Sequence, residues 1–314
     1  MSFLPSATEI LYELGAGSQV VGVTHECNYP KEAKLQTRVI KPAFDASTMS
    51  TKEIDNKIKE LFNNGENMYI VNDSILEELH PDIIIAQGIC EVCAPFTKEI
   101  NHAISILGYT PKVIILDPHN ISDILDNIYE IAKYIDKIKE GKNLVSSIKD
   151  RINRIKKITE LKNKEYLSKI LCLEWIDPFF TAGHWVPEMV EIAGGINGLS
   201  KSREKSRRTS IEEIKKFDPD KIILMPCGFN IDRSIKEYKN TITLTKNPEW
   251  NNLRAIKTDE LYLVDAGSYF SKPGPRTITG IEILAKIIFP NEFYHIQTPE
   301  NSYNKLMIND LTSK

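Results

Sequence analysis

A helical pattern of unusual length in the middle of the chain constrains the fold more than any other feature. Between residues 121 and 161 there is no Pro, Gly141 is the only Gly, and apolar residues recur at steps of three, four and seven. The pattern predicts one long helix, or two nearly collinear helices broken near Gly141. About 40 residues at 1.5 Å each would span roughly 60 Å, which exceeds one small domain. We therefore expect two lobes, residues 1–118 and 163–314, joined by a connecting helix over residues 119–162.

Short apolar runs alternate with amphipathic segments on both sides of this region. Such alternation predicts an α/β fold whose mainly parallel sheets are covered by helices on both faces. Residues 2–4 resemble the end of a first strand, so residues upstream of Met1 could be missing, and Ser6 with Glu9 fits a capping box. The polar residues after about 298 are expected to be loose. The expected strands cover residues 19–23, 68–71, 82–86, 112–116, 169–175, 221–225 and 260–264, and the expected helices residues 6–14, 97–107, 187–193, 211–217 and 276–287.

Composition excludes several classes of protein. The chain has 314 residues, of which 41% are hydrophobic and 26% charged, so it contains enough apolar residues for two ordinary hydrophobic cores. A formal net charge of -3 argues against a nucleic-acid binder. No stretch reaches the roughly 20 apolar residues of a membrane span, and the start lacks the pattern of a signal peptide. The sequence as it stands predicts a cytoplasmic protein, or an extracytoplasmic one only if its true N-terminus is missing.

Aromatic and polar residues accumulate directly after the expected strands. The carboxyl ends of parallel strands share one edge of a sheet, so these residues are expected to line a ligand cleft between the lobes. Each aromatic ring could instead anchor its loop on the core. We expect Trp185 to stack on a flat ligand, so that its replacement by Ala weakens binding and leaves the fold intact. The candidate ligand-binding residues are Pro5, Ser6, Thr8, His25, Tyr29, Gln87, Glu174, Trp175, Phe180, His184, Trp185, Cys227, Phe229, Tyr269 and Phe270.

A basic run over residues 201–208 precedes the expected helix at 211–217. Such runs are usually solvated loops. The position of this one also leaves room for Arg207 or Arg208 to reach an anionic group of a ligand.

Four segments together resemble a known family. Residues 2–9 (SFLPSATE), 22–30 (GVTHECNYP), 182–189 (AGHWVPEM) and 271–276 (SKPGPR) are similar to those of cobalamin-binding proteins of the periplasmic-binding-protein type, in a cysteine-bearing branch that looks cytoplasmic. The resemblance covers nearly the whole chain.

The resemblance implies a class III periplasmic-binding-protein-like fold and a carrier without enzymatic activity. The ligand it implies is a corrinoid, cobalamin above all, or another metal chelate. It also implies delivery to an ABC importer, with one exposed Glu on each lobe for docking. Glu91 matches in the first lobe, but residues 194–197 (GGIN) carry Ile and Asn where the second Glu is expected. The missing signal peptide is a second departure from the secreted members.

The cysteines leave further alternatives open. Five cysteines in a chain without a secretion signal argue against a disulfide framework, and Cys172 lies in an apolar strand as a buried filler. Cys90 and Cys93 could be a redox pair, small buried loop residues, or ligands of zinc or an iron–sulfur cluster together with Cys27. In the last case His25 or a ligand would supply a fourth position, and the site could carry catalysis. The sequence contains no phosphate-binding glycine loop and no H-E-x-x-H run.

Overall fold

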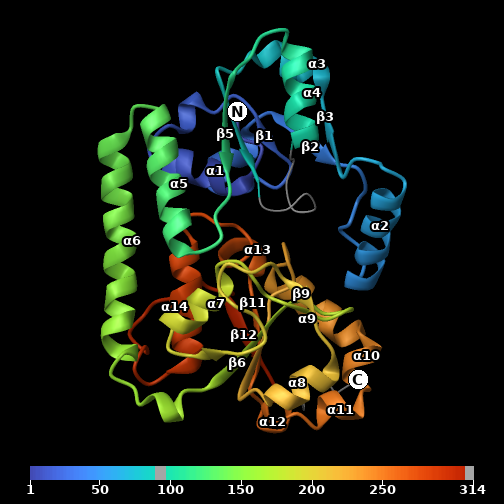
Figure 1. Cartoon of the computed structure of the whole chain (residues 1–314), viewed down its shortest axis with the longest axis vertical. Coiled ribbons are helices and arrows are strands. Elements are labelled where there is room, and N and C mark those ends of the chain that lie inside the picture. Colours follow the sequence, from blue (N-terminus) through green and yellow to red (C-terminus); the bar gives the residue numbers. More distant parts are fainter. Residues whose placement is uncertain (89–96, 308–314) are drawn as a thin grey trace. The chain divides into compact units, whose positions relative to one another are not determined.

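The computed structural model describes residues 1–88 and 97–307 (Figure 1). Contacts divide the chain into two compact units, each of which combines strands with helices. The α/β class predicted from the alternating pattern is therefore confirmed. Unit 1 comprises Met1–Met49, Glu53–Pro118 and Ser122–Ser147, and unit 2 comprises Ser50–Lys52, His119–Ile121 and Ile148–Lys314.

Unit 1 contains two groups of strands that the first residues of the chain connect. Strand β2 pairs in parallel with β1 and antiparallel with β3, while β4 and β5 pair in parallel. Ser2 bridges in parallel to Ile85 of β4, and its N–H also donates to the carbonyl oxygen of Gly22 beside β1, at 2.9 Å. Where the end of a first strand was expected, Ser2 makes an isolated bridge, and residues 3–4 belong to no strand. The strands are β1 (Val23–Thr24), β2 (Arg38–Pro42), β3 (Tyr69–Val71), β4 (Ile83–Gln87) and β5 (Lys112–Leu116).

Two helices of unit 1 pack on the hydrophobic core formed by these strands. Buried Phe3, Ile84 and Leu76 lie in one cluster with apolar residues of the helix that follows β3 and of the helix that precedes β5. The helices that begin in this part of the chain are α1 (Pro5–Glu13), α2 (Thr51–Asn63), α3 (Asp73–Leu79), α4 (Thr97–Leu107), α5 (Ile121–Tyr134) and α6 (Ile138–Thr159), with 3-10 turns η1 (Gly17–Gln19) and η2 (Lys31–Leu35).

The segment expected to form one long helix, or two nearly collinear helices, forms α5 and α6, which run side by side (Figure 1). The break lies at residues 135–137, where Asp136 adopts a left-handed φ of 55°. Gly141, expected to mark the break, lies inside α6, where an added Cβ would approach the Cβ of Ala132 to 2.6 Å. Gly141 therefore permits close packing of α5 on α6. The 22 residues of α6 span roughly 33 Å, and the division between the units falls within this helix.

Unit 2 is built on a mixed sheet whose central strands are parallel. Strands β6, β10 and β11 run in the same direction, and β8 also pairs in parallel with β6. The antiparallel strands β7, β9 and β12 extend the sheet outward. Its order is β12-β11-β10-β6-β7-β9, with β6 (Lys169–Trp175), β7 (Phe180–Thr181), β8 (Ile196–Asn197), β9 (Arg207–Arg208), β10 (Lys221–Leu224), β11 (Leu261–Val264) and β12 (Tyr303–Leu306).

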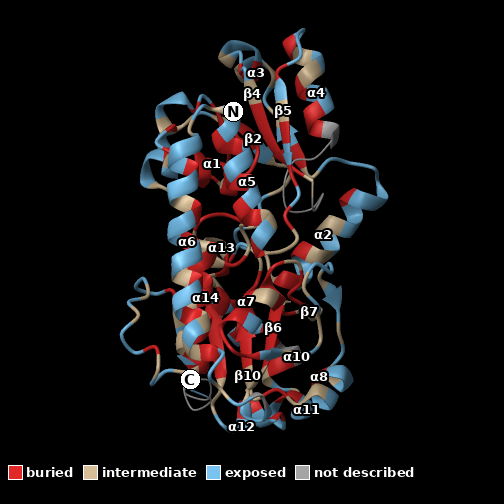
Figure 2. Ribbon diagram, turned by 60° about the vertical axis from the view of Figure 1, so that its left-hand side comes forward, coloured by how far each residue is buried: buried red, intermediate tan, exposed pale blue. Residues whose placement is uncertain are grey.

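Helices enclose this sheet from two sides. Helices α7 and α14 pack together on one side, and α8 to α12 lie on the other (Figures 1 and 2). Trp250, fully buried in the second layer, stacks on Phe179 at 5.6 Å and donates its indole N–H to the hydroxyl of Tyr238. The helices are α7 (Val186–Ile192), α8 (Ile211–Phe217), α9 (Ile231–Asn240), α10 (Ile242–Thr245), α11 (Pro248–Asn251), α12 (Arg254–Lys257), α13 (Ala266–Tyr269) and α14 (Thr277–Ile288), with a 3-10 turn η3 (Lys164–Tyr166).

Three local expectations are wrong. Residues 19–23 contribute only Val23 to a strand, because Gln19 ends the turn η1 and residues 20–22 form neither helix nor strand. The Ser6–Glu9 capping box does not form: α1 starts at Pro5, and no side chain caps it. Residues 303–306 are not loose, since β12 pairs with β11 and buries Leu306 in the core.

Within residues 1–88 and 97–307, no helix has both the length and the apolar character needed to cross a bilayer.

Candidate functional site

The loops after β6, β10 and β11 meet at one edge of the unit 2 sheet. These strands are parallel, so their carboxyl ends lie side by side. Backbone hydrogen bonds join the loops: the Cys227 N–H donates to Glu174 O at 3.1 Å, and the Gly267 N–H donates to Phe229 O at 3.0 Å. The partly buried Glu174 and Cys227 therefore lie at this edge, as predicted. We call it the unit 2 edge.

Three arginines lie over aromatic rings at the unit 2 edge. Phe180 belongs here although β7 runs antiparallel, because it pairs with Trp175 at the end of β6. A guanidinium group over an aromatic ring is stabilised by the ring quadrupole. The pairs are Arg208 over Phe180 at 5.3 Å, Arg233 over Phe229 at 3.7 Å and Arg276 over Tyr269 at 5.6 Å.

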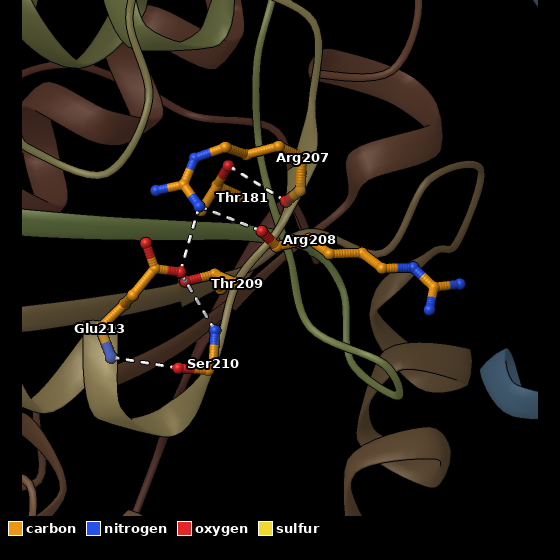
Figure 3. Close-up of polar contacts among 6 residues, drawn as sticks. All are labelled: Thr181, Arg207, Arg208, Thr209, Ser210 and Glu213. Atoms are coloured by element: carbon orange, nitrogen blue, oxygen red, sulfur yellow. Dashed lines mark hydrogen bonds and ion pairs between the residues drawn. The ribbon is translucent and has the colours of Figure 1, made fainter.

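The two adjacent arginines of β9 have different roles. Arg207 donates to the carboxylate of Glu213 at 3.1 Å, whereas the side chain of Arg208 extends away from Glu213 (Figure 3). Glu213 also completes a capping box with Ser210 at the start of α8. The sequence left open whether Arg207 or Arg208 contacts an anionic group of a ligand. Arg208 lies at the unit 2 edge, whereas Arg207 pairs with the first turn of α8.

Trp175 occupies the centre of the unit 2 edge and is partly exposed. Its ring meets that of Phe229 edge to face at 5.9 Å. Its indole N–H donates to the carbonyl oxygen of Thr51 at 3.0 Å. Thr51 in turn is held by Glu237, a buried carboxylate on α9.

Three predicted ligand-binding aromatics, Trp185, Phe229 and Phe270, are buried residues of unit 2. Trp185 is only 6% exposed, and its indole N–H donates to the carbonyl oxygen of Phe270 at 2.9 Å. Phe270 is itself buried at the end of α13. The expectation that Trp185 offers an open face to a flat ligand is therefore wrong, because its ring is enclosed by its own unit. Phe229 is also buried, and the guanidinium group of Arg233 covers one face of its ring.

His184 lies beside a second histidine that the sequence did not single out. The rings of His184 and His119 are 6.1 Å apart, and both residues belong to unit 2. His184 has a left-handed φ of 56°, and its N–H donates to Glu204 O at 2.6 Å. The loop between β7 and α7 thus fixes the backbone of His184 and, with it, the position from which its imidazole projects.

One predicted residue of unit 1, Thr8, contacts Cys27. Thr8 on α1 is buried and donates its hydroxyl to Ser2 Oγ at 2.9 Å, with Cys27 Sγ at 3.1 Å. The hydroxyl of Thr24 lies 3.4 Å from the same sulfur. Arg38 closes the group by donating to the carbonyl oxygens of Thr24 and Cys27 at 2.6 and 3.0 Å. This network fixes the loop after β1.

The remaining predicted residues of unit 1 differ in exposure. Tyr29 is exposed, His25 and Pro5 are partly exposed, and Ser6 and Gln87 are buried. The ring of His25 lies 6.0 Å from that of Tyr69. Tyr29 and His25 are therefore the members of this set with the most surface for a ligand.

The predicted cysteine metal site is not assembled in the described part of the chain. Within residues 1–88 and 97–307, no group of three His, Cys, Asp or Glu side chains is arranged to hold a metal ion. Cys90, Cys93 and the docking candidate Glu91 lie outside the described residues. A site shared by Cys27, Cys90 and Cys93 stays a prediction.

Cys172 is the buried filler that the sequence predicted, and burial raises the pKa of its thiol to about 12. Because the thiolate is the reactive form, we expect alkylation at about pH 8 to spare Cys172 in the folded protein and to label the partly exposed Cys227. Peptide mass spectrometry of iodoacetamide-treated protein measures both rates. Urea-unfolded protein is the control, in which both cysteines should react alike. Equal rates in the folded protein would contradict the burial of Cys172.

Sequence reasoning missed Thr51, Glu237 and Arg233. Glu237 and Arg233 lie on α9, whose polar surface carries no motif, and Thr51 comes from a segment 186 residues away from Glu237. The one available signal was the spacing of Arg233 and Glu237, which places both on one face of a helix.

The chain belongs to the periplasmic binding protein family, whose model matches residues 2–267. Its two α/β units and the site at a sheet edge agree with this class, and the predicted family relationship is confirmed. The members are solute-binding carriers, so the chain is a carrier rather than an enzyme.

Two relatives match almost the whole chain. An uncharacterized ABC transporter substrate-binding lipoprotein of Bacillus subtilis is 25% identical over 297 residues, which cover 93% of this chain and 80% of the relative. A vitamin B12-binding protein of Vibrio cholerae is 22% identical over 288 residues, covering 90% and 86%.

Solved structures share the fold at low identity. A possible iron-binding, periplasmic solute-binding protein of Staphylococcus epidermidis has a TM-score of 0.66 at 24% identity, covering 92% of this chain and 97% of that one. A periplasmic heme-binding protein of Pseudomonas aeruginosa has a TM-score of 0.68 at 17% identity, covering 92% of each chain.

Proposed function

We propose that the protein binds a metal chelate at the unit 2 edge, in the class that includes corrinoids, haems and ferric chelates. The observation that carries this proposal is the set of three arginine–aromatic pairs on loops of one sheet edge. The relatives support the same class, since their names include a vitamin B12-binding and a heme-binding protein.

The chemistry of the edge suits such a ligand in two ways. Aromatic rings such as that of Trp175 offer broad apolar faces to a macrocycle or an organic chelator. Guanidinium groups offer planar, weakly hydrated cations that pair with carboxylates. Within the proposed class, the arginines favour chelates that carry carboxylates, such as haem or ferric citrate. A corrinoid, the ligand predicted from the sequence, would use mainly the aromatic surface.

The proposed partner is an ABC importer that receives the chelate. The similarity to an ABC transporter substrate-binding lipoprotein supports this partner. In unit 2, the docking position predicted from the family resemblance falls on β8, where Ile196 is exposed in place of a Glu.

A carrier for such an importer acts on the outer side of the membrane, so we propose an extracytoplasmic location in place of the cytoplasmic one expected from the first residues. Fractionation of cells that express the native gene decides between them.

A titration followed by absorbance tests the proposed ligand class. Purified protein is titrated with cyanocobalamin, haemin and ferric citrate, and binding is followed by the absorbance of the chelate. Equilibrium dialysis then measures the free ligand concentration and gives the Kd of each chelate. We expect at least one chelate to bind with a Kd of about 1 μM or tighter, which corresponds to about 8 kcal/mol. Free citrate and metal-free protoporphyrin serve as ligand controls. Failure of all three chelates to bind would refute the proposal.

A further inference from the structure

We propose that Thr51 is a positioning residue that sets the orientation of the Trp175 ring at the unit 2 edge, and that Glu237 holds Thr51 in place. The inference rests on the proposed function, because it assigns Trp175 a ligand-facing role. Thr51 and Glu237 are both buried and lie 186 residues apart in the sequence.

The contacts of Thr51 with Glu237 are short and buried. The backbone N–H and the hydroxyl of Thr51 both donate to Oε1 of Glu237, at 2.8 and 2.6 Å. Thr51 has no exposed surface, and Glu237 is almost fully buried. A buried carboxylate requires such donors, because an unpaired charge in the interior is costly. The pairing therefore fixes Thr51 relative to α9.

Thr51 in turn reaches the strand that carries Trp175. Its carbonyl oxygen accepts the hydrogen bond from the Trp175 indole at 3.0 Å, and its hydroxyl oxygen lies 3.3 Å from the backbone N–H of Asp177. The indole N–H is the only polar group of a tryptophan side chain, so the direction of this bond constrains the plane of the ring. A shift of Thr51 would rotate the ring without removing its apolar surface.

Helix α9 closes the network from the other side. Glu237 lies four residues after Arg233, so both project from neighbouring turns of the same face. Arg233 covers Phe229, whose ring meets that of Trp175 edge to face. One helix thus supports the Trp175 ring twice, through Arg233 and Phe229 and through Glu237 and Thr51.

The test replaces Thr51 by Val, which keeps the shape of the side chain and removes the hydroxyl. The affinity for haemin and for cyanocobalamin, measured by equilibrium dialysis, should fall about three- to tenfold. Thr51→Ser should restore it. The matched control is Thr209→Val, since Thr209 also hydrogen-bonds a glutamate, at 2.8 Å, and lies outside this network (Figure 3). The control should bind as the wild type does.

A double-mutant cycle separates positioning from general stability. In a Trp175→Phe background the indole N–H is absent, so Thr51→Val should cause no further loss of affinity. An equal loss in that background, or wild-type affinity of Thr51→Val alone, would overturn the inference. If Thr51→Val does not fold, Glu237→Gln takes its place, with a weaker effect in the same direction expected.

A ligand-free measurement distinguishes this inference from the proposed function. Acrylamide quenching of the Trp175 fluorescence, obtained by subtracting the signal of the Trp175→Phe protein, should change in Thr51→Val and not in Thr209→Val. If the wild type binds none of cyanocobalamin, haemin and ferric citrate, the proposed function fails, and the quenching result alone decides whether Thr51 positions the ring. Unchanged quenching would overturn the positioning role.

Discussion

Replacement of Trp185 by Ala is expected to lower the free energy of unfolding by about 3–5 kcal/mol, the usual cost of removing a buried large aromatic side chain. The ring is 6% exposed, and its N–H is paired with the carbonyl oxygen of Phe270. The substitution leaves a cavity and also orphans this carbonyl. Urea denaturation followed by circular dichroism measures the loss.

Trp175→Ala is the matched control for this prediction. Trp175 is partly exposed at the unit 2 edge, so its removal should cost only about 1–2 kcal/mol of stability. Its effect on ligand affinity should be the larger one. If Trp185→Ala left stability unchanged and abolished binding, Trp185 would return to the ligand site that the sequence first suggested.

Removal of the Arg233 side chain should weaken binding of a carboxylate-bearing chelate about 10- to 100-fold. Hydrogen bonds between a guanidinium and a carboxylate contribute about 1.5–3 kcal/mol, and Arg233 lies closest to its ring among the three pairs, at 3.7 Å. The variant is Arg233→Ala, and the measurement is the Kd of haemin by equilibrium dialysis. Cyanocobalamin, which lacks carboxylates, should lose less affinity.

Two variants control for charge and geometry. Arg207→Ala removes the same type of side chain from a position that pairs with Glu213, so it should bind haemin as the wild type does. Arg233→Lys keeps the charge but not the planar fork, and we expect an intermediate affinity. If Arg207→Ala and Arg233→Ala weakened binding equally, the effect of Arg233 would be explained by general electrostatic attraction, and a specific contact between Arg233 and the ligand would be ruled out.

Several strands could be predicted well because their signals are local. Residues 112–116 and 169–175 form strands with the predicted bounds, since each is an apolar run bounded by turn residues. The position of the break between α5 and α6 was predicted wrongly, near Gly141, because the apolar period continues unbroken through Asp136. Two helices packed side by side need the same apolar faces as one long helix. The periodicity therefore does not distinguish the two arrangements.

The candidate site was predictable in location but not in detail. Parallel strands place their following loops at one edge, so the sequence located Trp175, Phe180 and Tyr269 there. It did not show that Trp185 points into the core, because burial depends on the packing of α7 and α13. The partnership of Thr51 with Glu237 spans 186 residues, and no local pattern encodes it.

Anomalous diffraction from crystals of the protein with a bound chelate tests the central claim most directly. Data collected at the iron or cobalt absorption edge locate the metal without reference to the organic part of the ligand. The account predicts one peak beside the unit 2 edge, next to Trp175 and the guanidinium groups of Arg208, Arg233 and Arg276. A peak bound by Cys27 away from this edge, or no ordered metal in crystals grown at saturating chelate, would contradict it.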